Sequence, residues 1–120
     1  MEMELDLAPQ LPDVSGNPFA LEEVMLNLVN NARDALEERR KSGWTGPARI
    51  RIDTFLGGEG VLRCVSIRVQ DWGAGMSATV LAKAFDPFFT TKSPDAGTGL
   101  GLAICKGIVE QSGGRIEMAS

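Results

Sequence analysis

A long amphipathic segment, from about Phe19 to Arg40, constrains the fold of this chain more than any other feature of the sequence. Apolar residues recur along it at spacings of three and four, the pattern of a helix with one buried face. These positions are Leu21, Val24, Met25, Leu28, Val29, Ala32, Ala35 and Leu36. Asn17 and Pro18 come just before it and supply a capping side chain and a first-turn proline. We therefore predict one long helix that packs on a core.

Alternating polar and apolar residues predict strands on either side of this helix. Met3, Leu5 and Leu7 alternate with acidic residues, as in a half-buried strand. Arg49 to Phe55 and Val61 to Gln70 alternate in the same way, and the glycine-rich turn between them favours an antiparallel hairpin.

The second half of the chain predicts two shorter helices and the beginning of a strand. Ser77 is placed to cap a helix that runs to about Ala84, and helical spacing returns from Leu100 to Gln111. Arg115 to Met118 is typical of a strand start. These elements together predict an α+β fold, a two-layer sandwich in which about three helices cover one face of a mixed, mostly antiparallel sheet.

Composition excludes several classes of function. The net charge of −4 argues against a nucleic-acid binder, and the absence of histidine excludes a Ser-His-Asp triad. No apolar run approaches the roughly 20 residues that span a bilayer, and no signal peptide is visible. The two cysteines, Cys64 and Cys105, suggest small core residues with reduced thiols, and hence a cytoplasmic protein.

The first cluster with chemical meaning lies along the long helix. Asn27, Asn31 and Asp34 form one polar stripe, at steps of four and three, along the border of the apolar face. An asparagine there can turn its amide oxygen to a metal ion or its NH₂ group to a phosphate. The alternative is a solvated helix face.

The second cluster is the run Asp71-Trp-Gly73-Ala-Gly75, directly after a predicted strand. A carboxylate at a strand end can accept a hydrogen bond from an exocyclic amine such as adenine N6, and the glycines let the backbone approach a flat ring closely. By itself this pattern is also that of an ordinary glycine turn.

The remaining two clusters lie in and after a long loop. The run from Phe85 to Lys92 carries three phenylalanines and a mobile positive charge, and it is either a functional lid or a loop pinned to the core. The run from Gly97 to Leu102 opens a helix, so it presents backbone N–H groups and the positive end of a helix dipole to an anion. Neither a Walker A loop nor a Rossmann fingerprint matches this arrangement.

These four clusters, in this order, resemble the N, G1, F and G2 boxes of sensor histidine kinases, most closely those of the nitrogen-regulation and hybrid-kinase branches. The nucleotide fold of these kinases, the Bergerat fold, is shared with gyrase, heat-shock chaperone and mismatch-repair ATPases. The resemblance implies that residues 1–120 are an ATP-binding catalytic domain, cut away from the hairpin that carries the phosphoacceptor histidine. It also implies that the final strand of the sheet is incomplete.

The resemblance implies a role for each matching residue. Asn31 would ligate a Mg²⁺ ion bridging the ATP phosphates, with Asn27 assisting, and Asp71 would hold adenine N6, partly through water. Lys92 would reach the phosphates from the lid. The nucleotide would also contact Ala35, Gly73, Gly75, Met76, Thr98, Gly99, Leu100, Gly101 and Leu102.

Two positions qualify this reading within the superfamily. The related ATPases carry a glutamate one turn before the metal-binding asparagine, as a base for water, and this chain has Asn27 there. An amide cannot take that proton, which favours phosphotransfer over hydrolysis. Many of the kinases place a lysine or arginine at the position of Asp34.

The resemblance thus implies a protein-histidine kinase domain that uses Mg-ATP, phosphorylates a separate dimerisation domain and feeds a response regulator. The isolated domain is expected to be monomeric, with no nucleic-acid or membrane contact, and its parent kinase is either soluble or membrane-anchored. The alternatives are a nucleotide-binding pseudokinase module, an ATPase of the gyrase type and a serine kinase of the anti-sigma type.

Overall fold

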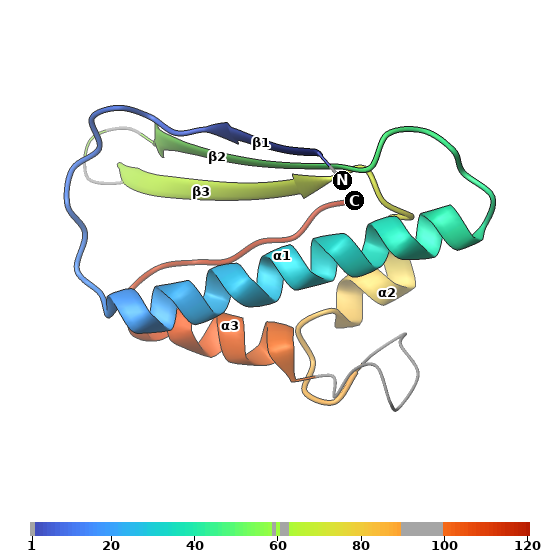
Figure 1. The fold of residues 1–120 in the computed structure, drawn as a ribbon. Coiled ribbons are helices and arrows are strands. Elements are labelled where there is room, and N and C mark those ends of the chain that lie inside the picture. Colours follow the sequence, from blue (N-terminus) through green and yellow to red (C-terminus); the bar gives the residue numbers. More distant parts are fainter. Residues whose placement is uncertain (1, 59, 61–62, 90–99) are drawn as a thin grey trace. The chain divides into compact units, whose positions relative to one another are not determined.

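The computed structural model describes residues 2–58, 60, 63–89 and 100–120. Its elements are, in chain order, β1 (Glu2–Asp6), α1 (Pro18–Lys41), β2 (Arg49–Gly57), β3 (Cys64–Asp71), α2 (Ala78–Lys83) and α3 (Gly101–Gln111) (Figure 1). The chain divides into two compact units, and α1 contributes to both. The first unit comprises the residues up to Ser15 and Val29–Ala74, and the second comprises Gly16–Leu28 and Gly75–Ser120.

The first unit contains a three-stranded mixed sheet in the order β1-β2-β3 (Figure 1). β1 pairs with β2 in parallel, and β2 pairs with β3 in antiparallel register, so that Ile50 lies opposite Asp71. The predicted hairpin and the predicted α+β class are therefore confirmed. The register also places Asp71 at the very end of β3.

The core of the first unit joins the C-terminal half of α1 to this sheet. Ala32 and Leu36 from the helix and Ile50 from β2 are buried together, with Ala48, Ile52 and Val69 packed around them. The helical spacing of Ala32 and Leu36 puts both on the face toward the strands. This packing fixes the part of α1 that lies beside the end of β3.

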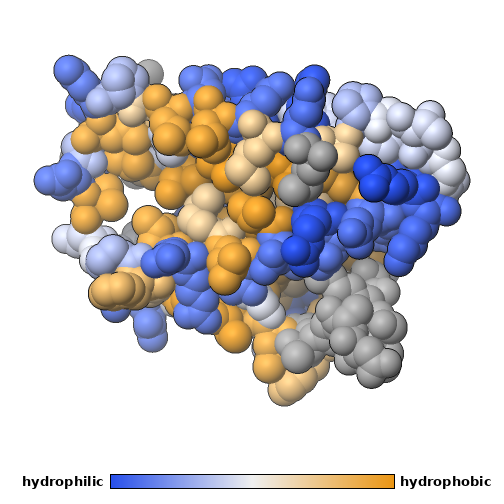
Figure 2. Space-filling model, viewed as in Figure 1, coloured by the Kyte–Doolittle hydropathy of each residue, from blue (hydrophilic) through white to orange (hydrophobic). Residues whose placement is uncertain are grey.

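The predicted burial of β1 is wrong. Met3, Leu5 and Leu7 are 48%, 61% and 56% exposed, although β1 forms where the alternation predicted it. β1 is the edge strand of the described sheet, and the buried cluster forms on β2 instead. Apolar side chains accordingly reach the surface over the strands (Figure 2). Leu21, predicted on the buried face of α1, and Cys64, predicted in the core, are exposed as well.

The second unit contains the N-terminal half of α1 together with α2 and α3. Asn17 caps α1 as predicted, with its Oδ1 accepting the Phe19 N–H at 2.9 Å. Ser77 caps α2 through the Val80 N–H at 3.2 Å, which is also as predicted. Val24 of α1 and Cys105 of α3 are both buried, and the Cys105 thiol lies 3.9 Å from the Val24 carbonyl. Burial raises the pKa of this thiol.

The predicted start of a final strand at Arg115 to Met118 is wrong. Residues 114–120 adopt no strand, and the described ladder consists of the β1–β2 and β2–β3 pairs. A strand exists only where its N–H and C=O groups pair with a neighbour, and alternation along one segment does not supply that partner. Of the helices that the structure describes, none has the length and apolar character needed to cross a bilayer.

An ion pair between a buried aspartate and an exposed arginine joins β2 and β3. Asp53 is buried, and Arg68 donates to both of its carboxylate oxygens, from Nε at 3.0 Å and from Nη2. These hydrogen bonds hold the pKa of Asp53 below its usual value, against the opposing effect of burial. The pair makes the stability of the first unit dependent on pH.

Replacing Leu36 by alanine is expected to destabilise the protein by about 2–5 kcal/mol, because the substitution leaves a cavity in the core. Leu26→Ala is the matched control, since Leu26 lies on the same helix but is 62% exposed. We expect Leu26→Ala to lower the free energy of unfolding by only about 0.5 kcal/mol. Urea unfolding measures both, and equal losses would contradict this description of the core.

Asp53→Asn is expected to destabilise the protein at neutral pH but to approach wild-type stability in acid. A lowered folded-state pKa stabilises the protein above the unfolded-state pKa, about 3.9 for aspartate. That stabilisation is lost as the pH falls through the lowered folded-state value. Urea midpoints from about pH 2 to pH 7 measure the difference. If the difference in urea midpoint between wild type and Asp53→Asn stayed constant with pH, the Asp53–Arg68 pair would not be the cause of the pH dependence. Arg68→Met should reduce the pH dependence of stability in the same way as Asp53→Asn.

Candidate functional site

The turn that follows β3 lies against α1 in the first unit. A Cβ atom added to Gly73 would sit 2.7 Å from both the carbonyl carbon and the Cβ of Ala35, so only glycine fits there. The Ala74 N–H donates to the Ala35 carbonyl at 3.2 Å and ties the same turn to the helix. The structure thus brings together Ala35, Asp71 and Gly73, three of the residues predicted to bind nucleotide.

The Asp71 carboxylate is held from within this turn. Its Oδ1 accepts the Gly73 N–H at 2.8 Å, and the residue is partly buried. An ionised carboxylate offers about four lone-pair sites, so one such bond orients the group and leaves capacity for another donor. The arrangement suits an amine approaching from solvent.

Two residues that the sequence analysis did not single out, Arg39 and Trp44, support the other side of the turn. Arg39 Nη1 donates to the Trp72 carbonyl at 2.7 Å, and the Arg39 guanidinium lies 4.0 Å from the centre of the Trp44 ring. One signal was present in the sequence. Arg39 continues the row of four-residue steps from Asn31 through Ala35, so it lies along the same side of the helix.

The predicted polar stripe is carried by one continuous helix that crosses both units. Asn31 lies one turn before Ala35 and is partly buried. Asp34 is within 3.8 Å of Arg33, in a pair exposed enough to contribute little energy. Within the described ranges, no group of three or more histidine, cysteine, aspartate or glutamate side chains could hold a metal ion.

The second unit brings Asn27 to the start of α3. A Cβ atom added to Gly101 would lie 3.0 Å from the Asn27 amide oxygen, while the Asn27 NH₂ group donates to the Glu23 carbonyl at 3.0 Å. α3 begins after Leu100, which as the N-cap residue provides no side-chain cap, and its first turn closes from the Ile104 N–H to the Leu100 carbonyl. The first N–H groups of such a helix have no intrahelical acceptor, which suits an anion.

Gly75 and Met76 belong to the second unit, whereas the Asp71 turn belongs to the first unit. Gly75 has a positive φ of 75°, which glycine tolerates. The Met76 N–H donates to the Ser120 hydroxyl at 2.8 Å. Leu102 is partly buried in the first turn of α3. Lys92, Thr98 and Gly99 lie outside the described residues, so their predicted contacts stay predictions.

The described part of the predicted lid is only partly packed. Phe85 is partly buried, with the Lys106 ammonium 5.8 Å from its ring centre. Phe88 is 74% exposed and has a positive φ of 67°, which is uncommon for a bulky residue. Phe88 therefore does not pin this loop to a core.

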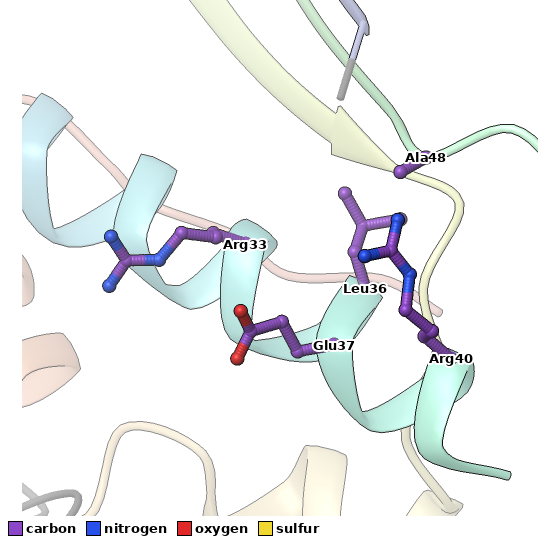
Figure 3. A pocket seen from close by; sticks show the side chains of 5 residues that line it. All are labelled: Arg33, Leu36, Glu37, Arg40 and Ala48. Atoms are coloured by element: carbon purple, nitrogen blue, oxygen red, sulfur yellow. The ribbon is translucent and has the colours of Figure 1, made fainter.

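A cavity of about 200 Å³ lies elsewhere in the first unit. Figure 3 shows the Leu36 side chain pointing toward Ala48, with charged side chains of α1 around it. None of the predicted nucleotide-binding residues lines this cavity, whose walls are Arg33, Leu36, Glu37, Arg40 and Ala48. The Asp71 turn of the first unit and the start of α3 in the second unit are therefore two separate candidate regions for ligand binding.

Most of the chain matches a known protein family. Residues 16–120 match the family described as histidine kinase-, DNA gyrase B-, and HSP90-like ATPase. The chain is 36% identical to the C4-dicarboxylate transport sensor protein DctB of Pseudomonas aeruginosa, over 98% of its own length and 18% of that protein's. It is 40% identical to the sensor histidine kinase ZraS of Escherichia coli K12, over 92% of its own length and 21% of that protein's. The chain thus spans about a fifth of each of these relatives.

Solved structures agree with this result. The mycobacterial sensor histidine kinase MprB superposes with a TM-score of 0.68 at 26% identity, covering 93% of this chain and 64% of the other. The catalytic domain of the histidine kinase ThkA superposes with a TM-score of 0.66 at 29% identity, covering 92% and 64%. The chain therefore belongs to the histidine kinase-, DNA gyrase B-, and HSP90-like ATPase family, as an ATP-binding domain of the sensor histidine kinase type.

Proposed function

We propose that this chain binds Mg-ATP and donates the γ-phosphoryl group to a histidine on a separate dimerisation domain. Residues 1–120 would form the catalytic domain of a two-component kinase. The observation that carries the proposal is the Asp71 turn, held on α1 by the Gly73–Ala35 approach with its carboxylate oriented by the Gly73 N–H. Family membership and the sensor-kinase relatives support the same reading.

Asp71 would accept a hydrogen bond from the adenine amine, directly or through water. The Gly73 N–H occupies Oδ1, so the adenine amine would use the remaining lone pairs of the carboxylate. Gly73 and Ala35 have small or absent side chains, and Gly75 and Met76 would complete the contacts to the base. A larger side chain at Gly73 would collide with Ala35 and with the Asp71 carboxylate, so it would disturb the group that holds the adenine amine.

The phosphates would bind at the start of α3. The N–H groups of Gly101 and Leu102 belong to the first turn of a helix whose N-cap residue, Leu100, provides no side-chain cap, and the helix dipole there also favours negative charge. Thr98, Gly99 and Leu100 would extend this cradle, and Lys92 would add a positive charge. The dense charge of a triphosphate fits this end of the helix.

Asn31 would ligate Mg²⁺ through its amide oxygen, with Asn27 assisting. Mg²⁺ prefers oxygen ligands and usually takes several of them from phosphates and water, so it needs few from the protein. The Asn27 oxygen faces Gly101, the residue that opens the proposed phosphate site. Since an amide cannot accept a proton from water, the pair would position a phosphoryl group for transfer and promote little hydrolysis.

The phosphoacceptor would have to come from another domain, because this chain has no histidine. We propose a dimerisation domain as the acceptor and a response-regulator receiver domain as the next carrier in a phosphorelay. Catalysis would then consist of positioning and charge neutralisation. We further propose that the domain is cytoplasmic and monomeric when isolated, whether its parent kinase is membrane-anchored or soluble.

Asp71→Asn is expected to weaken Mg-ATP binding at least tenfold, as measured by isothermal titration calorimetry. The substitution keeps an oxygen for the Gly73 N–H but replaces the other oxygen with a donor, which opposes the adenine amine. Asp13→Asn is the matched control, because it removes the same charge from an exposed position. Unchanged affinity in Asp71→Asn would remove the adenine assignment.

Asn31→Ala is expected to lower phosphotransfer at least about tenfold, through loss of a metal ligand. The assay supplies γ-labelled ATP, Mg²⁺ and a separate histidine-containing dimerisation domain, and measures acid-labile phosphohistidine. Asn30→Ala is the matched control one position away, and EDTA should abolish labelling. ATP binding by the wild type without any phosphohistidine would leave a non-catalytic nucleotide module. Rapid hydrolysis by the isolated domain would indicate an ATPase instead.

A further inference from the structure

We propose that Arg39 is a positioning residue for the adenine site, acting on Asp71 through a single peptide group. The proposal rests on the function proposed above, since it requires Asp71 to bind adenine. Arg39 need not touch the nucleotide. Its effect would pass through the peptide bond that joins Trp72 to Gly73.

The two ends of that peptide group have different partners. Its carbonyl, from Trp72, accepts a hydrogen bond from Arg39 Nη1 at 2.7 Å. Its N–H, from Gly73, donates to Asp71 Oδ1 at 2.8 Å. A peptide group is planar and rigid, so fixing the direction of the carbonyl also fixes the direction of the N–H. Arg39 therefore sets the orientation in which the Asp71 carboxylate is held.

The charge of Arg39 adds to this geometric effect. A guanidinium is always ionised, and a charge-assisted hydrogen bond to a carbonyl polarises the peptide group. Polarisation makes the N–H at the other end a stronger donor, as in other hydrogen-bonded chains. Arg39 would thus both aim the Gly73 N–H and strengthen its bond to Asp71.

Arg39 is itself held in place from the loop that follows α1. The Trp44 ring lies 4.0 Å from the guanidinium carbon, within the range of a cation–π contact. The Arg39 carbonyl accepts the Ser42 hydroxyl at 2.6 Å and the Trp44 N–H at 3.4 Å. A planar guanidinium can stack and donate at once, whereas the point charge of a lysine cannot reproduce both contacts.

The turn has a second attachment that does not depend on Arg39. Ala74 is bonded to the Ala35 carbonyl, and Gly73 packs against the same residue. The Trp72 N–H also donates to the Arg49 carbonyl at 3.3 Å. Removing the Arg39 side chain should therefore leave the turn on the helix and change mainly the orientation of one peptide group.

The experiment compares the affinities of ATP and GTP for Arg39→Met and for the wild type. GTP carries a carbonyl where ATP carries the exocyclic amine, so a guanine bound in the orientation proposed for adenine has no donor at that position for Asp71. We expect the affinity for Mg-ATP to fall about tenfold and that for Mg-GTP to change less than about twofold. The preference for ATP over GTP would then fall about tenfold. A purely structural role for Arg39 would weaken both nucleotides by the same factor.

Arg40→Met is the matched control, because it removes a neighbouring arginine that lines the separate cavity on α1. It should leave both affinities at the wild-type level. Arg39→Lys should recover only part of the ATP preference, since the ammonium can donate but cannot stack on Trp44. Trp44→Leu keeps the guanidinium and removes its stacking partner, so we expect a loss of ATP preference of about two- to threefold.

The outcomes separate the two levels of the proposal. If the wild type bound neither nucleotide, the proposed function itself would fail. If Arg39→Met kept the wild-type preference for ATP over GTP, the proposed role of Arg39 would be wrong, while the proposed function would still hold. Should Arg39→Met not fold, as judged by circular dichroism, Arg39→Lys and Trp44→Leu decide the question by the same ratio.

Discussion

The close approach of Gly73 to Ala35 is the contact on which the candidate site depends. It leaves no room for a side chain at residue 73, and it joins the end of β3 to the C-terminal half of α1. The neighbours of Ala35 on the helix, Ala32 and Leu36, are buried in the core of the first unit. Because a close-packed core resists sliding, the same packing that stabilises this unit also fixes where Asp71 stands relative to α1.

The polar contacts around this turn have different roles in orienting it. Ala74 anchors the backbone to the helix, while Arg39 sets the direction of the peptide group before Gly73. The Asp71 carboxylate then takes its orientation from that group. Under the proposed function, such a relay would allow Arg39, two turns beyond Asn31 on α1, to affect base recognition, and it would link the loop that carries Trp44 to Asp71. Small changes in that loop would therefore tune nucleotide preference.

Local sequence signals predicted the elements well. Apolar residues at spacings of three and four predicted α1, and Asn17 and Ser77 predicted two helix starts. The alternation of polar and apolar residues predicted the β2–β3 hairpin. These signals work because capping and periodicity depend on residues close in the chain. The wrong predictions were the burial of β1, Leu21 and Cys64 and a strand after α3, and all of them depend on partners that distant segments would supply. Alternation shows which side chains share a face but not whether anything covers it.

The sequence by itself determined the family, the order of the elements and the types of side chain available to bind a nucleotide. Each of these depends on residues that lie near one another in the chain. Only the tertiary structure decided that Gly73 meets Ala35, that the Asn27 oxygen faces Gly101 and that Arg39 reaches the Trp72 carbonyl. These contacts join residues 33 to 74 positions apart. No periodicity or motif encodes these contacts, because they arise from tertiary packing within each unit, of β3 on α1 in the first unit and of α3 on α1 in the second unit.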